Sequence, residues 1–206
     1  MKDTKRVFGA YAAWEYAREI DDLNKMSEKG WHLAKGGLYS NLFKKDESVQ
    51  YRYQIDYNPK IEDKARYIET FREQGWEYIN STFNGWHYFK KVYDASLPAE
   101  QYEIYCDNQS LLEDMQGRWK KLAKCLGAVL GVTFVMELIA TIRAFSVSSA
   151  ILTGVLLLEL ILVIFGSFQM NKPKRADGIK KTGRTFTAMV IVLFAGLLAA
   201  VITLFI

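Results

Sequence analysis

Three long apolar runs in the second half of the chain restrict its fold more than any other feature. They span residues 122–142, 147–170 and 186–206. Each has about the twenty residues that an α-helix needs to cross a hydrocarbon core. Water cannot satisfy backbone groups there, so an isolated apolar run of this length is expected to be a helix. The sequence therefore predicts a bundle of three transmembrane helices over residues 122–206.

Composition changes at the same point in the chain. All twelve tyrosines lie at or before Tyr105. Residues 1–117 hold 16 Lys and Arg against 20 Asp and Glu, a net charge of −4, and residues 118–206 hold 11 against 3, a net charge of +8. We therefore expect a soluble domain over residues 1–109, a juxtamembrane helix over 110–121 and the membrane bundle beyond it. The basic total reflects the membrane half rather than affinity for nucleic acid.

The basic residues that flank the apolar runs predict their orientation. Three cations precede the first run and a fourth, Lys124, lies at its start, six lie in the segment 171–184, and only Arg143 lies between the first two runs. The positive-inside rule places both basic segments in the cytoplasm. No apolar stretch follows the charged first residues, so no cleavable signal peptide is expected. The sequence predicts a multi-pass plasma-membrane protein with a cytoplasmic N-terminus and an extracytoplasmic C-terminus.

Two acids, Glu137 and Glu159, lie within the apolar runs. A carboxylate at membrane depth is expensive and is a functional hypothesis by default. Three interpretations are open: polar contacts that hold the bundle together, with Thr133 as one donor for Glu159, a contact in an oligomer, or an ion or substrate path. Gly127 and Gly131 form a GxxxG spacing that also permits close helix approach, so a homo-oligomer is one expected partner.

The junction between the two halves has helical character. Ser110 and Glu113 form a capping-box pattern that predicts a helix start. We expect this helix to run without a break through 110–142. Trp119, Lys120 and Lys121 are the candidate anchors at the membrane interface.

The soluble half contains a degenerate internal repeat. Its first copy runs from Leu23 to the Gly30-Trp31 pair, and its second from Ile68 to Gly75-Trp76. Apolar stripes at helical spacing precede each pair, and each glycine stands where a helix C-cap favours a left-handed residue. The stripes are Ala13, Ala17, Ile20, Leu23 and Met26 in the first copy, and Ile61, Ala65, Ile68 and Phe71 in the second.

Strand-like sequence follows each Gly-Trp pair, and 49–57 alternates strictly between apolar and polar residues. The expected order is strand, helix, three strands, helix and two strands. The bounds are 5–9, 13–29, 31–36, 38–45, 49–57, 61–74, 76–83 and 86–93, with a further short strand over 102–106. Two helices on one face of an antiparallel sheet make an α+β fold, which we expect to be a duplicated ferredoxin-like sandwich.

The segment from Leu23 to Leu33, the alternating strand from Tyr51 to Tyr57 and the Gly75-Trp76 pair together resemble a bacterial family, domain of unknown function 2812. The resemblance covers about residues 5–115. It implies C-terminal membrane helices, which such proteins commonly carry, and it implies an association with small transcription regulators and envelope-linked regulation. It brings no catalytic or ligand-binding residues.

The residues predict no enzyme. The only histidines, His32 and His87, each follow a tryptophan at a strand start and are expected to face solvent. Cys106 and Cys125 form neither a CxxC pair nor, with the histidines, a zinc pattern. No nucleotide-binding, hydrolase or metalloprotease motif is present, so we expect no catalytic residues, metal or cofactor. The acidic charge of residues 1–117 argues against a nucleic-acid partner.

A binding role fits the sequence best. The aromatic side chains Trp31, Trp76 and Trp86 are candidates for contact with a protein or ligand. We expect a non-enzymatic bacterial membrane protein whose cytosolic domain binds such a partner and couples it to the membrane bundle, in a setting such as envelope stress. The alternative is an accessory or small transport unit that acts through Glu159.

The orientation is testable with reporter fusions. An alkaline phosphatase reporter is expected to be active when fused after Ile206 and inactive when fused at Lys174, because Lys174 lies in a basic segment. A green fluorescent protein reporter serves as the reciprocal control. An inactive phosphatase at the C-terminus would contradict the predicted orientation.

Overall fold

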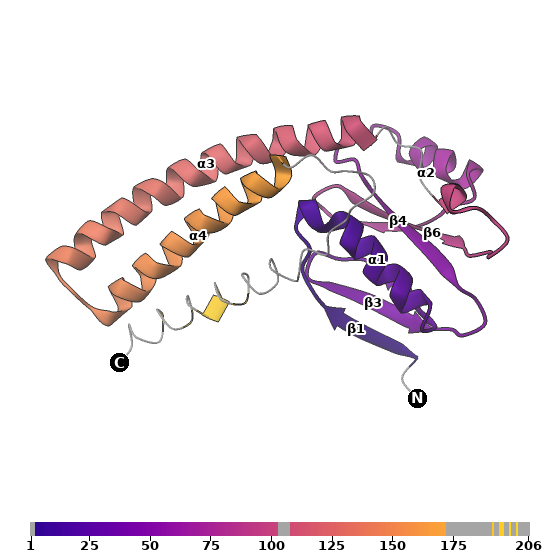
Figure 1. Ribbon diagram of the computed structural model, residues 1–206, viewed down its shortest axis with the longest axis horizontal. Coiled ribbons are helices and arrows are strands. Elements are labelled where there is room, and N and C mark those ends of the chain that lie inside the picture. The colour runs from indigo at the N-terminus through magenta and orange to yellow at the C-terminus, as the bar shows by residue number, and fades with distance from the viewer. Residues whose placement is uncertain are drawn as a thin grey trace. The chain divides into compact units, whose positions relative to one another are not determined.

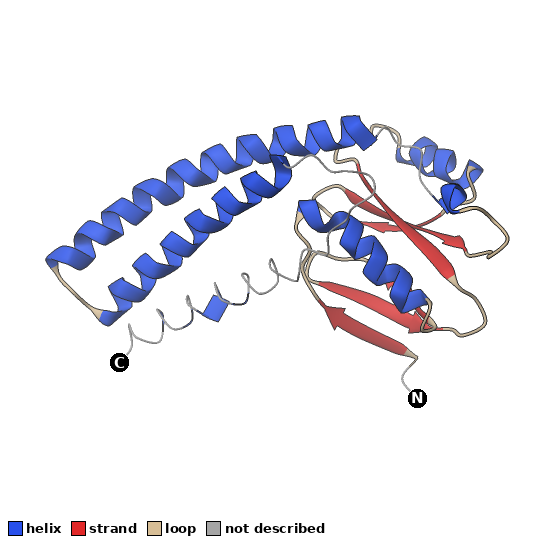
Figure 2. Cartoon of the chain, viewed as in Figure 1, coloured by secondary structure: helices blue, strands red, loops and turns tan. Residues whose placement is uncertain are grey.

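The computed structural model describes residues 3–102 and 108–171, together with the helical positions 191, 194, 195, 198 and 201. The chain divides into two compact units, Met1–Leu111 and Leu112–Ile206. Among the described residues, the first unit is α+β and the second is helical (Figures 1 and 2). The α+β class of the first unit is therefore confirmed. The remainder of the expected third span, 186–206, lies outside the described residues, as do residues 172–185, which hold all six cations of the basic segment 171–184.

The first unit consists of two successive β-α-β-β segments, and the expected order of strands and helices is confirmed. The first segment has β1 (Thr4–Phe8), the 3-10 turn η1 (Ala13–Glu15), α1 (Tyr16–Ser27), β2 (Trp31–Lys35) and β3 (Ser40–Lys45). The second has β4 (Tyr51–Tyr57), α2 (Lys64–Glu73), β5 (Glu77–Ser81) and β6 (Trp86–Val92), followed by the 3-10 turn η2 (Ala99–Tyr102). The strand expected over 102–106 is wrong at its first residue, because Tyr102 ends η2, and the rest lies outside the described residues.

The strands form two antiparallel three-stranded sheets, in the orders β1-β3-β2 and β4-β6-β5. The expected single sheet is therefore wrong. The two segments nevertheless repeat in detail. A bulge interrupts β2 between Leu33 and Lys35, and another interrupts β5 between Tyr78 and Asn80, each starting two residues after the tryptophan of its Gly-Trp pair. The repeat seen in the sequence thus extends to strand order and to local irregularity.

Helix boundaries follow from local chemistry. The Asp63 side chain accepts a hydrogen bond from Arg66 N at 3.0 Å, which fixes the start of α2. Ile61 therefore precedes the helix, and of the expected apolar stripe only Phe71 is buried. Gly30 and Gly75 have φ of 69° and 82°, as expected for residues that end a helix in the left-handed conformation.

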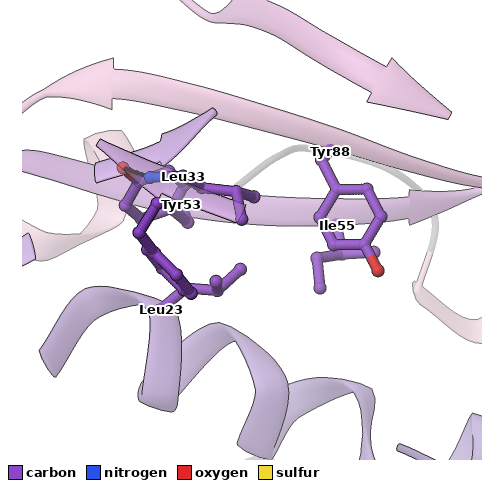
Figure 3. Close-up of a cluster of buried hydrophobic side chains, with 6 residues drawn as sticks. Leu23, Leu33, Tyr53, Ile55 and Tyr88 are labelled. Atoms are coloured by element: carbon purple, nitrogen blue, oxygen red, sulfur yellow. Dashed lines mark hydrogen bonds between the residues drawn. The ribbon is translucent and has the colours of Figure 1, made fainter. Parts of the chain in front are cut away.

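The hydrophobic core has two parts. The larger joins α1 to strands of both sheets, and Figure 3 shows Leu23 on the helix pointing toward Tyr53 and Leu33. Its buried members are Leu23, Leu33, Phe43, Tyr53, Ile55 and Tyr88. The smaller part packs α2 on β5 and β6 through Phe71, Trp76 and Phe89. Because the larger cluster draws on both segments, the two sheets share one interior.

Polar side chains complete the junction between the sheets. The outer edge of β4 is covered by α1, where Asn24 Oδ1 accepts from Tyr53 N at 2.8 Å and Ser27 Oγ accepts from Tyr51 N at 2.7 Å. The Asn80 amide binds both backbone groups of Gly36, at 2.8 and 2.9 Å. These bonds satisfy backbone groups at strand edges that would otherwise be buried without partners.

The second unit contains two long helices, α3 (Asn108–Arg143) and α4 (Val147–Asn171). The expected unbroken helix through 110–142 is confirmed, but α3 is already helical at Asn108, so Ser110 lies inside it rather than at its N-cap. The helices are antiparallel neighbours. Their polar contacts are Gln116 Nε2 to Met170 O at 2.7 Å, Trp119 Nε1 to Ser167 Oγ at 3.1 Å, and Thr141 to Thr153 at 3.1 Å between hydroxyl oxygens.

Two stretches of these helices, Met115–Arg143 and Val147–Met170, are long and apolar enough to cross a membrane. A core helix of a soluble protein can be equally apolar, but it is buried by its neighbours. In the most apolar 18-residue window of Met115–Arg143, 0% is buried, and in that of Val147–Met170, 6% is buried. Exposed apolar surface on this scale marks a membrane or protein contact. The exposed residues include Leu122, Leu126, Val129, Val132, Met136, Ile139, Leu157, Ile161 and Ile164.

Gly85 provides a test of the second hairpin. It has φ of 96°, and an added Cβ would lie 2.6 Å from Pro59 Cα and 2.9 Å from Pro59 N. Gly85→Ala is expected to destabilise the first unit by about 2 kcal/mol or more, a melting-temperature loss on the order of 10 °C, measured by tryptophan fluorescence. Gly117→Ala in α3 is the control, because nothing lies within 4 Å of its Cβ position. Equal stability of the two variants would contradict this description of the turn.

Candidate functional site

A hollow lies where α2 ends and β5 begins. Gly75 reverses the chain there, so the last turns of the helix face the first residues of the strand. The volume of the hollow is about 450 Å³. It is lined by Ile68, Arg72, Gly75, Trp76, Glu77 and Tyr78, which we call the α2 hollow. This volume is within the range of small-molecule sites.

The lining of the α2 hollow combines an apolar floor with charged walls. Trp76 is 2% exposed and belongs to the core. Arg72 pairs with Glu69 at 3.0 Å, with both side chains largely in solvent. Exposed pairs of this kind are weak, so the guanidinium is available to an anion that enters the hollow. The arrangement suits a ligand with a planar apolar part and a negative group.

A buried polar cluster adjoins the hollow through Tyr78. The ring of Tyr78 lies 6.1 Å from that of His87, and the Tyr67 ring lies 5.1 Å from His87 on another side. The Tyr67 hydroxyl donates to Asp56. The Tyr78 hydroxyl and the Nδ1 atom of His87 are both buried, and neither has a hydrogen-bond partner among the described residues. Buried polar atoms without partners are uncommon, and they often mark functional positions.

The histidines are not solvent-facing strand residues, so that prediction is wrong for both. His87 is 5% exposed, and its Nε2 lies 3.0 Å from Asn58 O. Burial lowers the pKa of His87, against a smaller opposing effect of the Asn58 carbonyl and the Asp56 carboxylate. His32 is 7% exposed and lies between Ser27 Oγ, at 3.2 Å, and Asp46 O, at 2.6 Å. Both rings link a strand start to a neighbouring loop, a role that a short sequence pattern does not reveal.

Lys91 on β6 connects the α2 hollow to the end of the first unit. An added Cβ at Gly75 would lie 3.3 Å from Lys91 Cε. The Lys91 ammonium donates to Gln74 O at the end of α2 and to Gln101 O in η2, both at 3.0 Å. Its Nζ also lies within 6 Å of the ring centres of Trp76 and Tyr102, at 5.8 and 5.7 Å. One cation thus contacts the hollow and the last described residues before α3.

A second buried network centres on an acid in α1. Glu19 is 7% exposed, and its Oε1 accepts from the Tyr88 hydroxyl at 3.0 Å and from Asn41 Nδ2 at 3.5 Å. Burial raises the pKa of Glu19 to about 7, while the two hydrogen bonds oppose the rise and nearby Asp22 adds to it. The network joins the two β-α-β-β segments, because Glu19 and Asn41 belong to the first and Tyr88 to the second.

The candidate aromatic residues have different environments. Trp76 lines the α2 hollow from the core. Trp31 is half-buried beneath the Lys5 ammonium, which lies 4.0 Å from its ring centre. Trp86 is half-buried against Tyr57, with ring centres 4.8 Å apart, and stacks on Tyr16 at 6.3 Å. The structure does not bring the three tryptophans into one site.

The candidate polar residues of α3 and α4 do not form one site either. Half-buried residues recur along the face of α3 that meets α4, and Glu137 is one of them; Glu159 is half-buried on α4. Neither carboxylate has a hydrogen bond or ion pair with the described residues, and Thr133 donates to Val129 O and Leu130 O of its own helix rather than to Glu159.

The other candidate residues of the second unit remain separate from one another. Trp119 contacts α4 through Ser167, while Lys120 and Lys121 are exposed. Added Cβ atoms at Gly127 and Gly131 would meet nothing within 4 Å, so the GxxxG pair makes no close approach to another helix among the described residues. Cys125 is free and exposed, and Cys106 lies outside the described residues. The described residues contain no group of His, Cys, Asp and Glu that could hold a metal ion.

Sequence reasoning missed Arg72, Tyr78, Lys91 and Glu19. For Glu19 a signal exists, because Glu15, Glu19, Leu23 and Ser27 recur every four residues and are the buried positions among the described side chains of η1 and α1. A search for apolar stripes alone cannot find a buried face that is half polar. Arg72, Tyr78 and Lys91 are brought together only by the turn at Gly75 and by the pairing of β5 with β6, which no local pattern specifies.

Glu19 gives the first unit a specific pH dependence. Its native pKa exceeds the ordinary value of 4.5, so the folded state binds the extra proton, and stability falls as pH rises from about 4.5 to about 7. Glu19→Gln is expected to raise stability at pH 8 by about 2–3 kcal/mol relative to the natural protein, with little difference at pH 4.5. Urea unfolding followed by tryptophan fluorescence measures this. Glu73→Gln, at an exposed position of α2, is the control; a pH-independent effect of Glu19→Gln would contradict the assignment.

Comparison with known proteins identifies the family of this chain. Residues 15–127, more than half of the chain, match the family described as "Protein of unknown function (DUF2812)". No curated protein and no solved structure matches the chain. The match begins at Glu15, covers the α2 hollow and Lys91, and ends within α3, so it includes the junction between the two units. The chain belongs to the DUF2812 family.

Proposed function

We propose that this protein is a non-enzymatic membrane sensor, in which the first unit binds a small molecule in the α2 hollow and transmits binding to the membrane helices. The ligand would be an amphipathic aromatic anion. Arg72 supplies the positive charge, and Ile68, Trp76 and the Tyr78 ring supply apolar and aromatic contact.

The double contact of Lys91 carries this proposal. A ligand that moves the end of α2 changes the position of Gln74 O, and the same ammonium holds Gln101 O in η2. Hydrogen bonds to a charged donor are roughly twice as strong as neutral ones. Moving the end of α2 away from η2 would break one of the two bonds to Lys91, so a joint movement costs less free energy than a separation. Lys91 thereby links ligand binding to the end of the first unit.

The path from η2 to α3 is short. Gln54 Nε2 donates to Tyr102 O at 2.8 Å, and the Tyr102 hydroxyl contacts Asp94 N and O at 2.7 and 3.1 Å, so this end is fixed to the unit. Only residues 103–107 separate Tyr102 from Asn108, where the 36-residue helix α3 begins. A displacement of η2 therefore has only five residues to cross before it reaches a helix that extends to Arg143.

The setting follows the predictions from sequence. The helices α3 and α4, with a third span over 186–206, would form a three-helix bundle in the bacterial plasma membrane, with the first unit in the cytoplasm. The first unit would be a divergent duplication of a ferredoxin-like sandwich. A protein partner or a second copy of the chain would receive the signal, and regulation of the response to envelope stress is the role that we favour.

The alternative function is an accessory or small transport unit that acts through Glu159. Its support is that Glu159 is half-buried in the second unit rather than fully exposed on an apolar surface. Glu159→Gln separates the two functions. Loss of the cellular phenotype at normal expression would favour the transport role, and an unchanged phenotype would favour the sensor.

Indole-3-acetate, a planar aromatic anion, is a suitable probe for the α2 hollow, with the neutral indole-3-acetamide as control. In full-length protein in lipid nanodiscs, millimolar indole-3-acetate is expected to slow hydrogen exchange over 68–78 and over 99–102. Arg72→Ala is expected to weaken this binding about tenfold, because it removes a charge-assisted hydrogen bond.

Lys91→Met tests the link separately. It is expected to preserve protection over 68–78 and to abolish protection over 99–102, whereas Lys60→Met, at an exposed position, changes neither. Absence of protection over 68–78 with the probe would contradict the binding site. Protection over 99–102 that survives in Lys91→Met would contradict the role of Lys91.

A further inference from the structure

The register of the first sheet places three cations on its outer face. Residues directly opposite each other in antiparallel strands project to the same side of the sheet. Leu42 on β3 is opposite both Arg6 on β1 and Lys35 on β2, so these three form one row across the sheet. Lys44 is opposite Thr4 in the next row, and Phe8 is opposite Ser40. Leu33 and Phe43, which alternate with these residues, enter the core on the other side.

We call this surface the basic face, defined by Arg6, Phe8, Lys35, Leu42 and Lys44. Its three cations are exposed, and Phe8 is 80% exposed. The Asp46 carboxylate, just after β3, attracts Lys44, but none of the three cations forms an ion pair with the described residues. The positions that share this face on β1, β2 and β3 include no Asp or Glu. In Figure 1 the strand β1 lies beside β3 at the edge of the sheet.

The charge of this face is opposite to that of its surroundings. Residues 1–117 carry a net charge of −4, yet these strands present three exposed cations around two apolar side chains. Exposed cations around an exposed aromatic ring match a surface of anionic lipid headgroups, where the cations meet the charge and the ring enters the interface.

We propose that the basic face binds the anionic surface of the bilayer that α3 and α4 cross. This proposal rests on the membrane placement in the proposed function. Tyr102 and Asn108 are separated by five residues, which reach at most about 20 Å when extended, and the helical residues 108–121 add about 20 Å, so the end of the first unit stays within about 40 Å of the bilayer surface. At such a distance even a few cations act at a high effective concentration of lipid. The rest of the unit is acidic and is repelled by the same surface, so binding fixes which side of the unit faces the membrane.

The test places a fluorescent bimane probe at Phe8→Cys in full-length protein whose two native cysteines are replaced by serine. The protein is reconstituted into nanodiscs of phosphatidylcholine, with or without phosphatidylglycerol, that carry a spin-labelled lipid as quencher. A probe at Phe83→Cys is the control, because Phe83 is 92% exposed in the β5–β6 turn and lies outside the basic face.

The Phe8→Cys probe is expected to be quenched in discs that contain phosphatidylglycerol, and less so without it or at high salt. Replacement of both Lys35 and Lys44 by Glu is expected to lower the ratio of bound to unbound state about tenfold or more. Replacement of both Lys60 and Arg66 by Glu, at exposed positions outside the face, is expected to leave the ratio unchanged.

Three outcomes would overturn the proposal. In the first, the Phe8→Cys probe is quenched no more than the Phe83→Cys probe. In the second, the Phe8→Cys probe is quenched equally with and without phosphatidylglycerol. Energy transfer between labelled copies without lipid quenching would instead assign the face to a second copy of the chain. Flotation of the protein with vesicles after alkaline extraction separates these outcomes from failure of the membrane placement, because a spanning protein floats whether or not the basic face binds.

Discussion

The contact between α1 and β4 is the interaction on which the rest of the first unit depends. Each β-α-β-β segment forms a three-stranded sheet, and the larger core takes buried side chains from both segments, so neither sheet has its full core without the other. Helix α1 belongs to the first segment but covers the edge of the first strand of the second, with Asn24 and Ser27 as acceptors for its backbone and Leu23 in the shared core. The duplicated segments therefore act as one folded body.

A buried acid lies at the junction of the two segments. Glu19 binds Tyr88 across the two segments, and its cost in an apolar setting appears as a pKa near neutrality. A carboxylate that accepts from two donors specifies one alignment of α1 against β3 and β6, which interchangeable apolar side chains do not. The α2 hollow lies away from this junction, in the smaller core around Phe71, Trp76 and Phe89, where the packing has fewer contributors. In the proposed function, binding there would shift α2 and Lys91 and leave the contact between α1 and β4 in place.

Each of the two units exposes a surface that suits a membrane. The helices α3 and α4 expose apolar side chains along their length, while the first sheet exposes an outer face of cations around Phe8. In the proposed function these surfaces act in sequence, since the helices fix the protein in the bilayer and the basic face orients the first unit against it. The short connection through Tyr102 would then allow ligand binding at α2 to alter the start of α3.

The sequence by itself determined the order of strands and helices, the left-handed glycines that end α1 and α2, and the two apolar helices. These features depend on periodicity and on residues close in the chain, such as the Gly-Trp pairs and the alternation in β4. It did not determine that the strands divide into two sheets, that His32 and His87 are buried, or that Arg72, Tyr78 and Lys91 meet at one hollow. Those outcomes depend on which strand edges pair and which side chains cover the remaining edges. Such choices arise from contacts between residues far apart in the chain, and only the tertiary structure decides them.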